Sequence, residues 1–279
     1  MMKSVTHSSL SMPVAAAAAA AVVQAPARPD GRFAHELRPM ACELGLLNRA
    51  DGSCRFSHGD STVLASVFGP LQPKRQRKQL IDRASLEVSF RPRTGIPGQL
   101  EREREAAIQG ALSSVILASL HPRTCITVVL QVVHEDGSIT AAAMNAAFLA
   151  LLDAGVPLQG MLSCVTAGLL LPNPSSESAG GKAGGKAGGK SGKSADSEMP
   201  CPVVTLDPIG EEEKASVSIV TVAVPSGACA KALDGSKHKG GIALCDCVGR
   251  SLDENTFNEA TAAAKGAATK VVQFMKMAV

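Results

Sequence analysis

The stretch HEDGSITAAAM, residues 134–144, has the residue types of a phosphate-binding turn. Asp136, Gly137 and Ser138 favour a tight turn, and the small residues after them let a backbone or an anion come close. Between a strand and a helix, such a turn directs backbone N–H groups and the positive end of the helix dipole at an anion. No lysine or arginine lies within the stretch. The turn is therefore either an anion site without its cation or a purely structural joint.

Motifs for other chemistry are weak. The sequence has no Gly-x-Ser-x-Gly elbow, and the Gly-Lys repeats of residues 180–193 are low complexity rather than a strand-to-helix phosphate loop. Its 8 cysteines form no Cys-x-x-Cys pair and no Cys/His cluster at zinc spacing. We therefore predict no metal site and no cofactor. We interpret the cysteines as reduced, buried thiols of an intracellular protein.

Composition limits how the protein can meet a nucleic acid. The net charge is only +3, so an anionic partner must be met by a local basic patch and not by a global field. Trp and Tyr are absent, which argues against base stacking on aromatic side chains. With 45% hydrophobic residues in 279, the chain can bury a substantial core.

Two segments are predicted to lie outside that core. Residues 1–27 contain an alanine run, and we predict a disordered extension, with an organelle transit peptide as the alternative. A secretory signal is disfavoured because polyalanine is only weakly hydrophobic. Residues 173–200 repeat Gly, Lys, Ala and Ser, so we predict a flexible insertion in one domain that spans residues 28–279. Transient RNA contact through its lysines is the less favoured alternative; they are Lys182, Lys186, Lys190 and Lys193.

The elements that must position the turn are read from hydrophobic periodicity. Strands and helices alternate in a way typical of a mixed α/β domain. Predicted strands are a hairpin within 53–69 joined at Gly59-Asp60, a half-buried strand at 84–90, a strand at 125–133 covered on both faces, and strands at 162–171, 201–206, 216–224 and 241–248. Predicted helices run from about Glu101 to Leu120, from the N-cap Ser138 to Asp153, and from near Asp253 to the C-terminal region.

Several segments, in this order, resemble the ribonuclease PH (RNase PH) family. They are RPDGR at 28–32, LRPM at 37–40, GDSTVLASVFGP at 59–70, the run from 128 to 157, and LDPIGEEEKASVSIVTVAV at 206–224. The resemblance covers most of residues 28–275. It implies an α/β fold of the α+β kind with a mixed sheet, a single RNase PH-like domain of the ribosomal protein S5 domain 2-like type.

The resemblance also implies an activity that this sequence is not equipped to perform. Active members cleave RNA from its 3′ end by phosphorolysis, and their turn carries a phosphate-binding arginine where this chain has Thr140. Glu213 and Ser218 stand at the positions of two family aspartates, and Ala106 and Gly110 at those of two RNA-binding arginines. Without an anion clamp and an acid, transition-state stabilisation is lost. We therefore predict no catalytic residues.

The resemblance is closest to the RNase PH-like subunits of the eukaryotic RNA exosome core. It implies a hexameric ring of such subunits, S1/KH cap subunits, an attached exoribonuclease and single-stranded RNA as partners, and a location in the nucleus (nucleolus) and cytoplasm, with no membrane partner. We accordingly predict a non-catalytic structural subunit that lines an RNA channel.

Channel walls need cations that meet phosphates without reading bases. The candidates are Lys74, Arg75, Arg77, Lys78, Arg91 and Arg93, with both groups expected at one rim. The alternative for each of these residues is that it is an ordinary solvated side chain or forms a salt bridge at a ring interface.

A second function is kept as an alternative. The chain would then be an active phosphorolytic or metal-dependent 3′–5′ exoribonuclease working as a homodimer. Its metal would be bound by Glu213 with Glu211 and Glu212. A run such as EEEK is more often a solvated surface segment, and that is our interpretation here.

Overall fold

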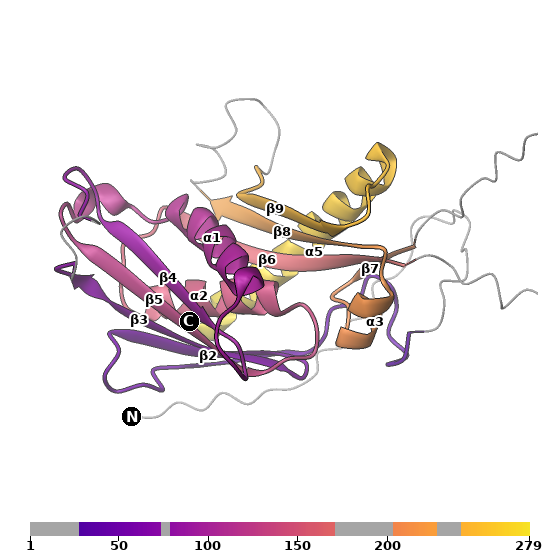
Figure 1. Ribbon diagram of the computed structural model, residues 1–279, viewed down its shortest axis with the longest axis horizontal. Coiled ribbons are helices and arrows are strands. Elements are labelled where there is room, and N and C mark those ends of the chain that lie inside the picture. Colours follow the sequence, from indigo (N-terminus) through magenta and orange to yellow (C-terminus); the bar gives the residue numbers. More distant parts are fainter. Residues whose placement is uncertain (1–27, 74–78, 171–202, 228–240) are drawn as a thin grey trace, which may run out of the picture.

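The computed structural model describes residues 28–73, 79–170, 203–227 and 241–279, which form two β-sheets with helices between and around them (Figure 1). The strands are β1 (Met40–Leu44), β2 (Gly52–His58), β3 (Ser61–Leu71), β4 (Ser85–Arg91), β5 (Cys125–His134), β6 (Gly160–Leu170), β7 (Val203–Leu206), β8 (Ser218–Gly227) and β9 (Leu244–Gly249). The helices are α1 (Gln99–Ser113), the short 3₁₀ helix η2 (Ala118–Leu120), α2 (Ile139–Asp153), α3 (Gly210–Ala215) and α5 (Glu254–Ala278).

Sheet topology confirms the predicted mixed α/β class. One sheet has five strands in the order β1-β2-β3-β5-β4, and the other has four in the order β7-β6-β8-β9. β4 and β5 are parallel, whereas the other neighbours are antiparallel. The predicted hairpin is present as β2 and β3, which pair from His58↔Ser61. Gly59 in its turn has φ 61°, a left-handed conformation that favours glycine.

Helix α2 is the centre of the core. It contacts β2 and β3 of one sheet and β6 of the other, and it lies between the two sheets in Figure 1. A helix that is apolar all round must be buried, and the alanine-rich sequence of α2 satisfies this. Gly52 of β2 shows how close the packing is, because an added Cβ would lie 2.3 Å from the carbonyl oxygen of Ala150. Helix α5 also joins the sheets, packing on β6 and β8 and placing Phe274 against Phe56 of β2.

A buried amide in α2 completes the second sheet. Strand β7 pairs with β6 only over Ala167–Leu170, which leaves the backbone of Cys164 without a strand neighbour on that side. Asn145, fully buried, replaces it: its Nδ2 donates to the Cys164 carbonyl at 3.0 Å and its Oδ1 accepts from the Cys164 N–H at 2.8 Å. Both backbone groups are thereby satisfied in the core.

Two predicted elements need correction. The first predicted helix was placed to Leu120, but α1 ends at Ser113 and only η2 follows. The chain leaves the helix because residues 115–117 bond to a distant segment, with Leu117 N–H donating to Pro157 and Gln159 N–H to Val115. The prediction that β5 is covered on both faces is also wrong. One face is buried, whereas Gln131 and Val133 on the other are exposed.

The cysteine prediction is partly wrong. Cys54, Cys125 and Cys164 are buried, as predicted, but Cys245 and Cys247 are exposed on the edge strand β9. The predicted disordered extension, residues 1–27, and the predicted flexible insertion, residues 173–200, lie outside the described residues, as do Cys201 and Cys229.

Across the described residues, none of the helices combines the length and the apolar character that a membrane crossing needs.

Candidate functional site

The candidate site is the turn between β5 and α2, and its backbone requires glycine. Gly137 has φ 74° and Ser138 has φ 52°, so two successive residues are left-handed. A Cβ on Gly137 would lie 2.5 Å from the carbonyl oxygen of Pro208. Ser138 occupies the predicted N-cap position, but its hydroxyl donates to the Pro208 carbonyl and does not cap the helix. The turn therefore packs directly on the segment that joins β7 to α3.

A buried arginine, Arg38, is hydrogen-bonded to the backbone of the turn. Arg38, only 5% exposed, donates from Nη1 to the carbonyl oxygen of Asp136 at 2.6 Å and from Nη2 to that of Gly137 at 3.3 Å. Its Nε and Nη2 also donate to the carboxylate of Asp207 at 2.8 and 2.7 Å. Ser61 donates to the Gly137 carbonyl at 2.7 Å and supports the turn from β3. The N–H donors of the Arg38 guanidinium are thus already hydrogen-bonded to oxygen atoms of the chain itself.

The carboxylate of Asp207 is the counter-charge of that arginine. It is fully buried, and the Nε2 atom of the buried His58 lies 3.1 Å from its Oδ2, without hydrogen-bond geometry. Burial alone would raise the pKa of Asp207, but the hydrogen bonds from Arg38 and the nearby His58 prevail and lower it to about 2. Burial lowers the pKa of His58. The arginine and aspartate therefore form a buried ion pair under the turn.

The anion position of the turn is already filled by a side chain. Glu213 of α3 accepts the N–H of Ser138 through Oε1 at 2.6 Å. Burial, the largest cause, raises the pKa of Glu213 although the Ser138 N–H opposes it. The interpretation of EEEK as a solvated run is therefore wrong for Glu213, and also for Glu212, which is buried and pairs with Arg28 at 2.7 Å. Their partners are distant in sequence, so no local pattern could reveal these contacts.

One cation near the turn was missed by the sequence analysis. Arg104 of α1 lies with Nη1 4.0 Å from Oε1 of Glu135 and with its guanidinium carbon 5.7 Å from the centre of the Phe90 ring. Its charge also lowers the pKa of Glu213, against the dominant effect of burial. The positions predicted to lack arginine, Ala106 and Gly110, lie on the same helix. Arg104 thus faces carboxylates on the turn and α3.

The remaining predicted positions do not converge on the turn. Thr140 lies in the first turn of α2 and is half-buried. Ser218 is buried at the start of β8, where its hydroxyl donates to the carbonyl oxygen of Arg250 at 3.1 Å. No group of three or more His, Cys, Asp or Glu side chains suited to a metal ion occurs among the described residues.

Two of the six basic RNA candidates, Arg91 and Arg93, lie among the described residues. Arg91 and Arg93 are exposed at the carboxyl end of β4, which runs parallel to β5 and so ends at the same edge as the turn. Lys74, Arg75, Arg77 and Lys78 lie outside the described residues. The expected convergence of both groups at one rim, and their contact with RNA, therefore stay predictions.

The turn can position its neighbours, but its groups are already paired. The N–H of Ser138 is bound by a carboxylate, and the guanidinium of Arg38 is neutralised by Asp207. An incoming phosphate would have to displace Glu213, and the two nearby cations already face carboxylates: Arg38 faces Asp207 and Asp136, and Arg104 faces Glu135. The arrangement therefore stabilises the joint of β5, α2 and α3 and disfavours a bound anion.

Comparison with known proteins finds a family match over part of the chain. The model of the 3′ exoribonuclease family, domain 1 (RNase PH), matches residues 36–157. Over 143 residues the chain is 41% identical to the "Exosome complex exonuclease RRP46 homolog" of Oryza sativa subsp. japonica, covering 51% of this chain and 60% of the relative. Over 150 residues it is 38% identical to the "Exosome complex component Rrp41" of Methanosarcina mazei, covering 50% of this chain and 30% of the relative. The chain thus spans less than two thirds of these relatives.

The solved structures agree. The crystal structure of rice Rrp46 superposes with a TM-score of 0.69 at 28% sequence identity, covering 89% of this chain and 98% of that one. The match extends well beyond residues 36–157 and includes both sheets of the fold. The family domain and the shared architecture therefore lead to one conclusion: the chain carries an RNase PH family domain and has the RNase PH-like fold.

Proposed function

We propose that this chain is a non-catalytic structural subunit of the RNA exosome core ring, supporting 3′–5′ RNA processing and degradation by helping to form the RNA-conducting channel. The relatives named as exosome components support ring membership. The observation that carries the non-catalytic part is the 2.6 Å contact between Glu213 Oε1 and the Ser138 N–H, which puts a carboxylate where a phosphate would bind.

Phosphorolysis requires cations at the attacking phosphate and an acid at the leaving oxygen. In this chain the turn offers Thr140 at the family's arginine position, and Arg38 is already paired with Asp207. Removing a single preorganised donor from an active site typically costs about 10²–10³ in rate. Loss of the clamp together with a carboxylate at the turn therefore argues for a structural role.

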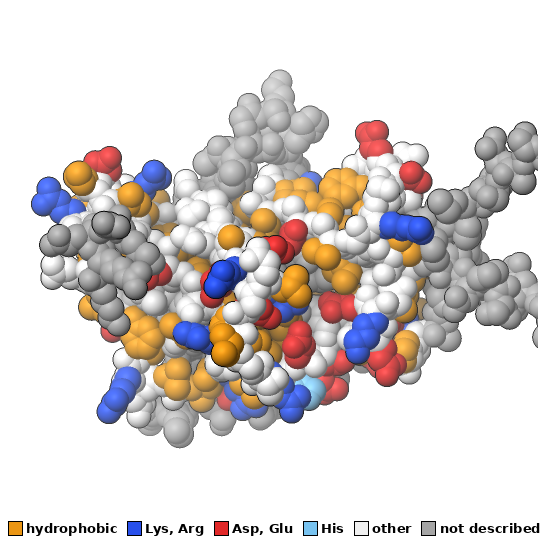
Figure 2. Space-filling view, in the orientation of Figure 1, with side chains coloured by type: hydrophobic (Ala, Val, Ile, Leu, Met, Phe, Trp, Pro, Cys, Tyr) orange, Lys and Arg blue, Asp and Glu red, His pale blue; other side chains and the backbone are white. Residues whose placement is uncertain are grey.

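The proposed partners follow from ring membership. They are other RNase PH-like exosome subunits, S1/KH cap subunits, an attached exoribonuclease and single-stranded RNA, in the nucleus (nucleolus) and cytoplasm. Figure 2 shows acidic and basic side chains intermixed on the face that carries α1 and α3, in keeping with a net charge of only +3. RNA would accordingly be met by local cations, and Arg91 and Arg93 are the proposed contacts at the turn edge.

Charge reversal at these two positions tests the proposal. We expect Arg91→Glu with Arg93→Glu to weaken RNA threading through the assembled complex at least about tenfold at physiological salt, with a shallower salt dependence, because phosphate contacts and counterion release are lost. The measurement is protection or degradation of a labelled single-stranded RNA by the complex purified from cells. Native mass measurement of the same preparation should find a large complex of distinct subunits.

The control separates channel contacts from interface contacts. Arg55→Glu changes another exposed arginine, whose nearest carboxylate, Glu43, is 3.9 Å away and also exposed. This control should leave RNA threading unchanged. If the Arg91/Arg93 variant no longer enters the complex, the two arginines belong to a subunit interface instead. If only a homodimer of this chain is found, ring membership is wrong.

A further inference from the structure

A cavity of about 260 Å³ lies away from the turn, between β4, α1 and η2. Most of its lining is apolar: Leu80, Ala84, Leu86, Ile116, Ala118 and Ile126. Pockets for drug-sized molecules usually measure about 300–1,000 Å³. This cavity is smaller, and its size suits aliphatic side chains better than a metabolite or a cofactor.

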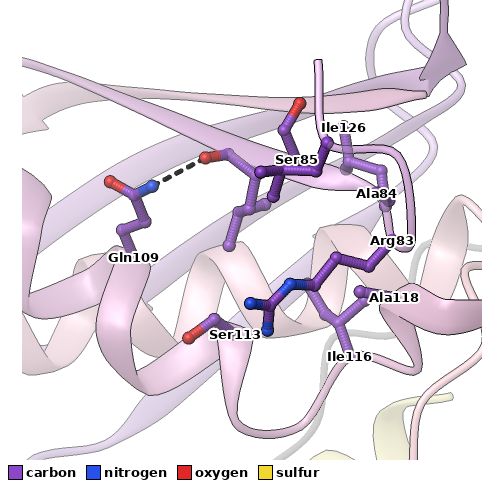
Figure 3. A pocket seen from close by; sticks show the side chains of 10 residues that line it. Arg83, Ala84, Ser85, Gln109, Ser113, Ile116, Ala118 and Ile126 are labelled. Carbon is purple, nitrogen blue, oxygen red and sulfur yellow. Dashed lines mark hydrogen bonds between the residues drawn. The ribbon is translucent and has the colours of Figure 1, made fainter. Parts of the chain in front are cut away.

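Four polar residues also line the cavity: Arg83, Ser85, Gln109 and Ser113. Figure 3 shows the guanidinium of Arg83 reaching across the opening toward Ser113 of α1. Gln109 lies on the same helix and is fixed there, because its Nε2 donates to the carbonyl oxygen of Leu86 at 2.8 Å (Figure 3). Apolar and polar side chains thus share the lining of the cavity, and the guanidinium of Arg83 lies at its opening.

Exposed apolar side chains extend the surface outward from the cavity. Leu80, Ile81 and Leu120 are 44%, 71% and 59% exposed. Arg123 is exposed and its backbone lies beside Leu80, because its N–H donates to the carbonyl oxygen of Leu80 at 3.1 Å. Large apolar residues grouped on a surface mark interaction sites. We call this surface, made of Leu80, Ile81, Leu120, Arg83 and Arg123, the η2 patch.

The η2 patch has two exposed cations, Arg83 and Arg123, and the exposed carboxylate of Asp82 lies between Ile81 and Arg83, so its net charge is positive. Within the described residues, neither Arg83 nor Arg123 forms an ion pair with a carboxylate. A cation at the edge of an apolar surface is best complemented by a carboxylate that follows or precedes an apolar side chain. A bare RNA backbone would meet the arginines but would leave the cavity and the apolar side chains uncovered.

We propose that the η2 patch docks a short linear segment of a partner protein, in which an aliphatic side chain enters the cavity and flanking acidic residues pair with Arg83 and Arg123. The segment is extended and acidic, with leucine or a similar residue as its anchor. This binding site is separate from the β5–α2 turn and does not depend on the proposed ring function.

The test is fluorescence anisotropy of the full chain with a labelled acidic peptide, EEDLEEDLEE, titrated to saturation. We expect saturable binding. Arg83→Glu with Arg123→Glu should weaken it at least about tenfold, which is the scale of losing close charge pairs. Ser113→Trp, which closes the mouth from an exposed helix position, should weaken it to a similar degree. Arg49→Glu, at an exposed position between β1 and β2, should leave the affinity unchanged.

Two matched peptides separate the contributions. Replacing both leucines by serine should abolish binding through the cavity, and replacing every acidic residue by its amide should abolish binding through the arginines. Absence of saturable binding by EEDLEEDLEE, or binding that both patch variants leave unchanged, would overturn the proposal. The proposal would also be overturned if the peptide does not bind but a labelled oligouridylate does, with a lower affinity for the Arg83/Arg123 variant. Thermal unfolding of each variant shows whether it is folded.

Discussion

We expect Asp207→Asn to lower the free energy of unfolding by about 3–5 kcal/mol, the cost of breaking a buried ion pair by removing one partner. Asp207 is fully buried and accepts from Arg38 through both carboxylate oxygens and from the Arg38 backbone N–H at 3.0 Å. The amide has the same size but no charge, so it leaves the buried Arg38 guanidinium without its main counter-charge. Urea unfolding followed by circular dichroism measures the change.

The pH dependence of stability identifies the cause of that loss. The folded-state pKa of Asp207 is about 2, below its ordinary value of 3.8. A carboxylate with a depressed pKa contributes stability that is complete above the unfolded pKa and is lost as pH falls through the folded pKa. The difference between wild type and Asp207→Asn should therefore shrink as the pH falls from about 4 toward 2. As a control, Asp30→Asn changes an exposed carboxylate beside Arg32 and should alter stability by less than about 1 kcal/mol.

A second large effect is expected at Asn145. We expect Asn145→Leu to cost about 2–4 kcal/mol, because it leaves the buried N–H and carbonyl of Cys164 without partners. Met144→Leu is the matched control on the same buried helix, and a volume-conserving apolar change of this kind costs less than about 1.5 kcal/mol. Urea unfolding of both variants measures the difference. If Asn145→Leu is as stable as the control, the amide does not substitute for a strand at this point of the sheet.

Local patterns predicted the elements that depend on local causes. The β2–β3 hairpin follows from alternation and Gly59-Asp60, and α2 follows from an apolar run that glycine and proline end. The end of α1 could not be predicted, since Ile116 forms an isolated bridge with Leu158, which is far away in sequence. Tertiary pairing there overrides the helical periodicity.

The candidate site was predictable only in part. The turn at Gly137 and the missing arginine at Thr140 are visible in the sequence. The carboxylate that occupies the turn is not, because Glu213 reaches Ser138 across 75 positions of the chain. The same holds for Arg28 and Glu212, which meet only when the residues before β1 pack on α3. A charged run such as EEEK looks solvated in a sequence, and only the fold shows that Glu212 is buried and Glu213 half-buried.

The most direct test of the central claim is phosphorolysis by the purified chain. Labelled single-stranded RNA is incubated with the protein and inorganic phosphate, and released nucleoside diphosphates are measured. We expect no release above background for the wild type and for Glu213→Ala, because removing that carboxylate frees the turn but does not restore the arginine that Thr140 replaces. Phosphate-dependent release of nucleoside diphosphates by the wild type, abolished in Glu213→Ala, would contradict the account. Metal-dependent cleavage without phosphate would instead support the alternative of an active nuclease.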